Sequence, residues 1–183
     1  MSVLDKVAAA VTPAASDEDR AQAHADARAL SRGNDWLGQI LDHHEQIDAL
    51  FGRAKAAGGV ADRQAVLEEL GTLLTGHSIA EEAVIYPALV KADYESKATM
   101  AYTQQSTAKT EMFLLEGLDP NSEEWSDKLD HIIGAVRQHV YQEESSWFPD
   151  LAQSPDVDQA MLTDKYAEQF GRYMGADKPA MFN

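Results

Sequence analysis

Cysteine is absent from the sequence of 183 residues. The chain can therefore form no disulfide and offers no thiolate to a metal ion, so a metal site here has to be built from histidine and carboxylate side chains. The absence fits a reducing compartment, and it is the first of two reasons to expect a cytoplasmic protein.

Long apolar runs are absent as well, and none approaches the ~20 residues that cross a bilayer. The N-terminal stretch MSVLDKVAAAVTPAASDEDR contains a short Ala/Val patch, but the patch is thin and Asp5 precedes it. A secretory signal peptide combines a basic start with a continuous apolar segment, which this stretch lacks. We therefore expect a cytoplasmic protein that does not bind membranes.

Basic residues are scarce. Lysine and arginine number 15 against 31 aspartates and glutamates, which gives a net charge of -16 at pH 7. A surface with this charge repels nucleic acid and anionic lipid, so we expect neither as a partner. Hydrophobic residues make up 44% of the chain, enough at this length for one domain with a sizeable core.

Sustained alternation of apolar and polar residues, the pattern of half-buried strands, is missing. Periodic apolar stripes between Gly, Pro and Asn residues predict helices instead, with Ser16 and Ser122 as N-caps and a kink near Pro87. We expect the fifth helix to end ahead of Pro149. The predicted helices cover about residues 16–33, 34–58, 62–90, 94–117, 122–148 and 158–173.

Four long helices with short connections predict an all-α fold, an antiparallel up-down four-helix bundle over residues 34–152. Residues 1–33 are expected to form an N-terminal arm or helix. Residues 153–183 are expected to form a short C-terminal helix and a tail packed on the bundle.

An internal repeat is the most informative pattern. GHSIAEEAVIYPAL (residues 76–89) and QHVYQEESSWFPDL (residues 138–151) share one skeleton, in which His77 and His139 lie 62 residues apart, as do Glu81 and Glu143. Two helix hairpins related by a pseudo-twofold axis would bring the copies together at the centre of the bundle.

The spacing His-x-x-x-Glu has a chemical meaning on a helix. The two side chains lie on one face about 6 Å apart along the axis, so that the imidazole can bind one metal while the carboxylate bridges to a second. A single copy is usually only a surface pair. Two copies in apolar surroundings predict metal binding, because four buried ionisable groups are costly to desolvate without a cation, and these donors suit iron, manganese or zinc.

The neighbours of the motif are interpreted as supporting residues. Glu82 and Glu144 are expected to face outward or to support the site, and Tyr86 and Trp147 to be core aromatics. On the first bundle helix, DHHEQIDALF supplies His43 and His44, each of which can belong to an apolar stripe. One of these is expected to be a ligand and the other a neighbouring group.

These motifs resemble the hemerythrin-like, HHE cation-binding family over roughly residues 35–152. The family pattern is one His on the first bundle helix, HxxxE on the second, one His on the third and HxxxE on the fourth. HEQIDALF resembles the first motif and favours His44 over His43. The resemblance implies a non-haem iron centre with two ions, one ion being the alternative and zinc or manganese less favoured. Its terminal ligands would be His44, His77 and His139, and its bridges Glu81 and Glu143.

The third helix departs from the family pattern, because YTQQSTAKTEMFLLEGL contains no histidine. The repeat offset puts Ser106 at the expected position, whereas the helix pattern favours Gln105. Three interpretations remain open. Gln105 binds weakly or holds a water, Tyr102 supplies a phenolate, or His24 or His131 replaces the missing ligand.

The resemblance implies a protein that binds or reacts with a small oxidant or gas, namely oxygen, peroxide or nitric oxide, in redox or stress sensing or protection. A peroxide-degrading or oxidase enzyme is the alternative favoured by an open metal position. Metal storage or a structural metal is a further alternative. A sensor would need a separate protein partner, and both a monomer and a homodimer are compatible with the sequence.

Overall fold

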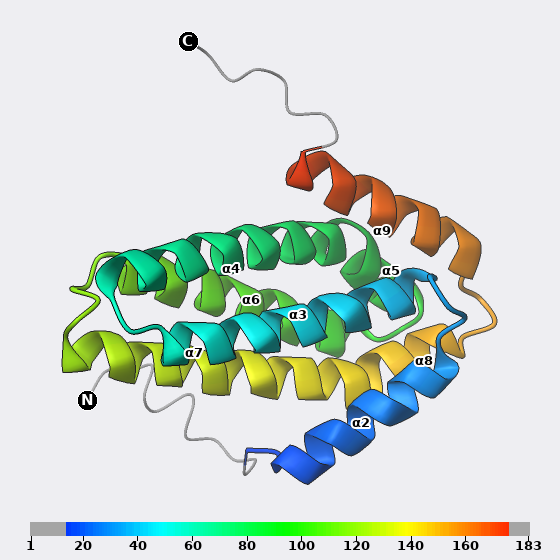
Figure 1. Cartoon of the computed structure of the whole chain (residues 1–183). Coiled ribbons are helices and arrows are strands. Elements are labelled where there is room, and N and C mark those ends of the chain that lie inside the picture. Colours follow the sequence, from blue (N-terminus) through cyan, green and yellow to red (C-terminus); the bar gives the residue numbers. More distant parts are fainter. Residues whose placement is uncertain (1–13, 176–183) are drawn as a thin grey trace.

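The computed structural model describes residues 14–175, and this part of the chain is helical without strands. The four longest helices lie side by side, and successive members are joined at opposite ends (Figure 1). They are α3 (Trp36–Ala56), α4 (Val60–Ala80), α6 (Glu95–Glu116) and α7 (Glu123–Gln142). The prediction of an all-α bundle is confirmed.

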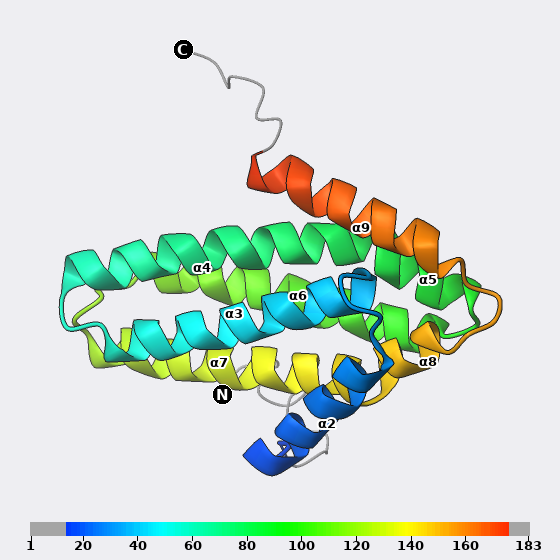
Figure 2. The same cartoon turned by 45° about the vertical axis from the view of Figure 1, so that its right-hand side comes forward.

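Two further helices lie on opposite sides of this bundle (Figures 1 and 2). Helix α2 (Asp17–Leu30) packs near the end of α7, and α9 (Gln159–Met174) packs along α4. Residues 1–13 of the predicted arm and 176–183 of the predicted tail lie outside the described residues. The division into arm, bundle and C-terminal segment stays an interpretation.

Side-chain caps define where several helices begin. Ser16 and Asp19 form a reciprocal capping box at the start of α2, and the side chain of Ser122 accepts a hydrogen bond from the backbone of Trp125 in α7. Both caps agree with the sequence prediction. These bonds satisfy backbone N–H groups that the first turn of a helix leaves without partners.

Both repeat copies contain a short π-helical turn that sequence reasoning did not predict. The turns are η1 (Glu81–Ile85) and η2 (Glu143–Trp147), and each begins at the glutamate of the motif. The short helices α5 (Tyr86–Lys91) and α8 (Phe148–Ala152) follow them.

The predicted end of the fifth helix ahead of Pro149 is therefore wrong, since the helical path continues to Ala152. Each proline occupies the start of a new α-helical segment, where its missing N–H is tolerated. In the first copy the carbonyl of Glu82 accepts a hydrogen bond of 2.8 Å from the hydroxyl of Tyr102.

The buried apolar residues form two clusters along the bundle. One contains Trp36, Leu41 and Phe148, and the other contains Ile47 and Trp125. Between Leu41 and Ile47 on α3 lie His43 and His44, so the buried polar groups occupy the layer between the two clusters. Such surroundings exclude water and strengthen electrostatic interactions. In the described residues no helix is long and apolar enough to cross a membrane.

Candidate metal centre

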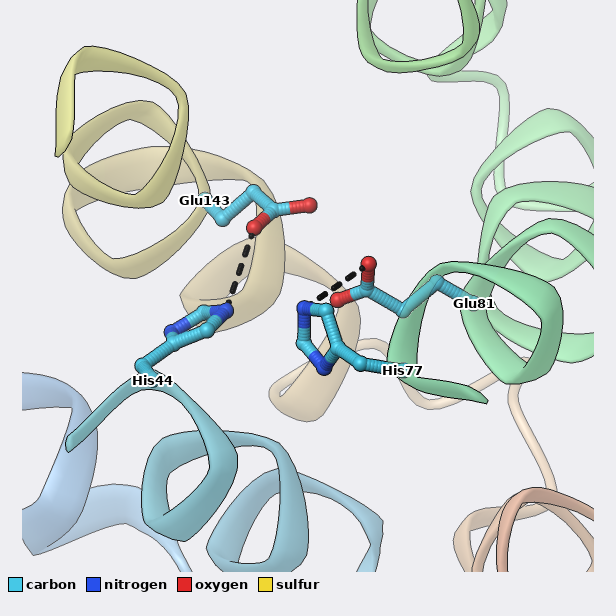
Figure 3. A group of neighbouring side chains, drawn as sticks. All are labelled: His44, His77, Glu81 and Glu143. Atoms are coloured by element: carbon cyan, nitrogen blue, oxygen red, sulfur yellow. Dashed lines mark ion pairs between the residues drawn. The ribbon is translucent and has the colours of Figure 1, made fainter. Parts of the chain in front are cut away.

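Four buried side chains from three parts of the chain converge in this layer (Figure 3). His44 comes from α3, His77 and Glu81 from the junction of α4 and η1, and Glu143 from η2. Each offers one donor atom, and these atoms all lie within 4.8 Å of one another. That is the scale on which a single cation contacts several ligands.

The inward-facing donor atoms lack partners within the described structure. His44 Nε2, Glu81 Oε1 and Glu143 Oε2 are buried and make no hydrogen bond to any described residue. His44 Nε2 lies 3.4 Å from Glu143 Oε2, an ion-pair distance without hydrogen-bond geometry. Buried polar atoms are rarely left in this condition. A cation among them would satisfy all three, so the donor set fits a metal ion.

The outward ring nitrogens of the three motif histidines are held by hydrogen bonds. The Nδ1 atom of His44 lies 2.8 Å from Glu144, that of His77 3.2 Å from the hydroxyl of Tyr166, and that of His139 2.7 Å from Gln104. When a partner accepts the proton of Nδ1, the Nε2 lone pair is free to bind a metal. All three imidazoles therefore have the arrangement of metal-ligating histidines.

The charges around His44 compensate for its burial. Burial alone lowers the pKa of His44, but the carboxylates of Glu143 and Glu144 outweigh it and raise this pKa to about 10. Burial raises the pKa of Glu144, yet hydrogen bonds from His24 and His44 lower it to about 2. Without a metal the proton on His44 thus supplies positive charge in the centre, and metal binding would displace it.

Burial shifts the pKa of His77 and of Glu81, the two cluster residues of the first repeat copy, in opposite directions. Burial, followed by the neighbouring histidines, holds the pKa of His77 well below its usual value. Burial and the charge of Glu143 raise the pKa of Glu81 well above the ordinary value of a glutamate. Both pKa shifts show that burial disfavours a charge in this layer. A bound cation would favour the ionised carboxylate and so lower the pKa of Glu81.

The second end of the centre is different in composition. His139 Nε2 lies 3.3 Å from Glu143 Oε1 and 3.4 Å from the hydroxyl of Tyr86. That hydroxyl also donates to Glu143 at 2.9 Å. On α6, where the family pattern has a histidine, Gln105 is buried, its side-chain amide donates to Glu81 and its Oε1 has no partner among the described residues. This end offers one imidazole where the first end offers two.

The remaining predicted residues lie outside the four-residue cluster. His43 is buried with its Nδ1 atom 2.9 Å from the hydroxyl of Tyr166. The hydroxyl of Tyr102 donates a hydrogen bond to the carbonyl of Glu82 rather than facing the cluster. His24 lies 3.0 Å from Glu144 and therefore touches the centre indirectly, through a group that also holds His44. His131 is exposed on α7, as is Ser106 on α6.

Sequence reasoning missed the roles of Tyr86, Gln104 and Tyr166, and left that of Glu144 open. Tyr86 carried no local signal, since residues five apart on a regular α-helix face different sides, and only the π turn η1 brings Tyr86 back toward Glu81. Glu144 follows a predicted ligand directly, but a regular helix would turn it away from the site. Tyr166 and Gln104 carried no local signal, because their contacts come from helix packing.

Comparison with known protein families matches the region that contains these motifs. The family model for the hemerythrin HHE cation-binding domain matches residues 37–151, which include all four cluster residues. The chain belongs to this family. The hemerythrin match ends before α9 begins and starts after α2 ends, so both flanking helices are additions to the matched region.

One curated relative is a DNA nickase from Nostoc sp. (strain PCC 7120 / SAG 25.82 / UTEX 2576). It is 28% identical over 130 residues, which cover 69% of this chain and 35% of the relative. The chain thus spans about a third of that protein's length. No solved structure matches the chain.

Proposed function

We propose that this hemerythrin-family protein is a non-haem iron protein that binds or reacts with a small oxidant or gas, namely oxygen, peroxide or nitric oxide. The observation that carries the proposal is the convergence of His44, His77, Glu81 and Glu143 with unpartnered donor atoms in a buried layer. Imidazole and carboxylate donors suit iron, with manganese and zinc less favoured. Bound iron would supply redox chemistry and a coordination position for the small molecule.

The residues differ in what they contribute to such a centre. His44 and His77 would hold the first ion, Glu81 and Glu143 would bridge, and His139 would hold the second ion. The outer groups Glu144 and Gln104 would keep the imidazoles of His44 and His139 in the tautomer that leaves Nε2 free. The donor set is unequal at the two ends, so we expect one tightly bound ion at His44 and His77 and a weaker one at His139.

A groove offers small molecules a route to this layer. It has a volume of about 520 Å³, lies among α2, α3 and α7, and is lined by residues that include His44, Glu144 and His24. The two innermost of these residues are buried, whereas His24 is half-buried. A diatomic gas or peroxide is small enough to use this route.

Peroxide breakdown is a second candidate function. It is supported by Gln105, which leaves the His139 end with fewer strong donors than the His44 end. Metal catalysis needs a vacant coordination position, and a weakly ligated ion keeps one. Storage of metal or a structural metal is the third candidate, and it requires no reactivity.

The metal content tests the main proposal. The full chain is expressed with excess iron and examined by metal quantification and optical spectroscopy. We expect iron in at least one equivalent, with near-ultraviolet bands from ligand-to-iron charge transfer. Zinc as the only metal under these conditions would remove the redox functions and leave the structural candidate.

Oxygen evolution from peroxide tests the second candidate. The iron-loaded wild type is compared with Gln105→His, which adds the missing imidazole, and with Ser106→His, which adds one at the neighbouring exposed position. We expect only Gln105→His to change the rate. An inactive wild type whose spectrum and reactivity are the same in both variants would exclude the enzyme.

The partners proposed here are small molecules rather than DNA. The Nostoc relative is named a DNA nickase, but two-thirds of that protein lies outside the matched region. This chain carries a net charge of -16, which opposes binding to a polyanion. A nicking assay on supercoiled plasmid, run with iron-loaded and chelator-treated protein, is expected to show no protein-dependent cleavage.

A further inference from the structure

A tyrosine from outside the family-matched region reaches the candidate metal centre. Tyr166 lies on α9 and is completely buried. Its hydroxyl oxygen is 3.2 Å from His77 Nδ1 and 2.9 Å from His43 Nδ1, so it bridges two imidazoles of different helices. His77 is a member of the cluster, whereas His43 is not.

The hydrogens of this trio have one consistent order. His77 Nε2 faces Glu81 at 3.2 Å on the inner side, so a metal-binding His77 carries its proton on Nδ1 and donates it to the Tyr166 oxygen. The single hydroxyl proton of Tyr166 is then available to His43 Nδ1. His43 Nδ1 lies 2.9 Å from the hydroxyl oxygen, within hydrogen-bond distance of that proton.

The packing of α9 determines where this hydroxyl lies. The His43 ring stacks on Phe170 with ring centroids 4.0 Å apart. On α4, a Cβ atom placed on Gly76 would lie 2.9 Å from Tyr173 Cδ1 and 3.3 Å from Phe170 Cε2. The absence of a side chain at Gly76 therefore permits close approach of α9 directly beside His77.

We propose that Tyr166 is a positioning residue of the metal centre, which holds the His77 imidazole in the orientation and tautomer that bind the ion. Helix α9 is then a working part of the centre, although it lies beyond the hemerythrin-matched residues. The inference rests on the proposed metal binding. Outer hydrogen bonds of this kind commonly change metal affinity by about 10- to 100-fold.

Tyr166→Phe tests the inference, since it keeps the ring and removes only the hydroxyl. The affinity for ferrous iron is measured without oxygen by competition with a chromogenic chelator, and the visible spectrum is recorded after substitution with Co²⁺. We expect affinity at least about 10-fold weaker than in the wild type and an altered cobalt spectrum. The matched control is Tyr173→Phe on the same helix, a residue that is 37% exposed, and this variant should match the wild type in both measurements.

A second variant covers the case in which Tyr166→Phe does not fold. His43→Leu removes the acceptor of the Tyr166 proton while leaving both the hydroxyl and His77 in place, and we expect a smaller loss of affinity with the same spectral change. Wild-type affinity and spectrum in the folded variants would overturn the inference while leaving the proposed function intact. A wild type that binds neither iron nor cobalt would overturn both.

Discussion

Glu81 illustrates how the centre costs stability without its metal. Its carboxyl group is completely buried, and burial together with Glu143 raises its pKa well above the usual value. A carboxyl whose pKa is raised by folding destabilises the folded state at any pH above its ordinary pKa, because the unfolded chain prefers the ionised form. The cost is therefore present at neutral pH.

Glu81→Gln is expected to stabilise the metal-free protein and to abolish tight metal binding. The amide carries no charge, so we expect the free energy of unfolding at pH 7 to rise by about 1–2 kcal/mol in the presence of a chelator. Urea unfolding and metal analysis measure the two effects. Glu82→Gln is the control, since Glu82 pairs with Lys109 outside the cluster and its replacement should retain the metal. A less stable metal-free Glu81→Gln would contradict this account.

The hydroxyl of Tyr102 was predicted as a candidate phenolate ligand, but in the structure it contacts the backbone. It donates to the Glu82 carbonyl. We expect Tyr102→Phe to lower the free energy of unfolding by about 1 kcal/mol, the value of one hydrogen bond, and to leave the iron content and spectrum unchanged. Loss of iron in this variant, measured on the purified protein, would restore the phenolate interpretation.

Helix α2 is joined to the centre by a pair of charged groups. The hydrogen bond from His24 to Glu144, with further contribution from Glu45, raises the pKa of His24 above its usual value of 6.5. The stability that this histidine contributes is fully present below the unfolded pKa and is lost as the pH rises through the folded pKa. Solvent screens the pair, because His24 is half-buried.

His24→Ala is therefore expected to have a pH-dependent effect on the metal-free protein. We expect a melting temperature several degrees below that of the wild type near pH 6, with the difference shrinking toward zero in alkaline solution. Thermal unfolding at a series of pH values measures this. His131→Ala, a substitution at an exposed position of α7, provides the comparison. A difference that grows toward alkaline pH would have the wrong sign for the His24–Glu144 pair.

The π-helical turns explain how one element can carry both a ligand and a proline. In η1 the backbone N–H of Tyr86 donates to the carbonyl of Glu81, five residues earlier. Pro87 then lies in the first turn of the α-helical segment that follows. The same sequence of elements recurs at η2 and α8. Such turns are frequent at functional sites, and here they begin at the two glutamates that face the centre.

Helix α9 packs closely against α4 at Gly76. Alanine substitutions at two glycines distinguish the effect of this close packing on stability from the effect of helix propensity. A Cβ at Gly134 of α7 would meet nothing, so Gly134→Ala should raise the free energy of unfolding by about 0.5–1 kcal/mol. A Cβ at Gly76 would meet Tyr173 Cδ1 at 2.9 Å, so Gly76→Ala should show no gain and a net loss. Urea unfolding of both variants measures the contrast. An equal gain in both would mean that α9 does not pack against Gly76.

Much of the fold could be predicted from the sequence, because helix periodicity and caps such as Ser16 and Ser122 are local features. The ends at the prolines could not, since a π turn depends on how the following segment packs. The repeated His-x-x-x-Glu spacing led to four candidate residues, and three of these lie with His44 in the four-residue cluster. The choice of His44 over His43 came from the family resemblance, and His44 is the one in the cluster.

Residue spacing was sufficient for the two imidazole–carboxylate pairs, because residues four apart on a helix share a face whatever surrounds them. Tertiary packing alone decided what holds those imidazoles. Tyr166 meets His77 across 89 residues of chain, and His24 meets Glu144 across 120. Contacts at such distances depend on how α2 and α9 pack against the bundle, and no local pattern in the sequence encodes that geometry.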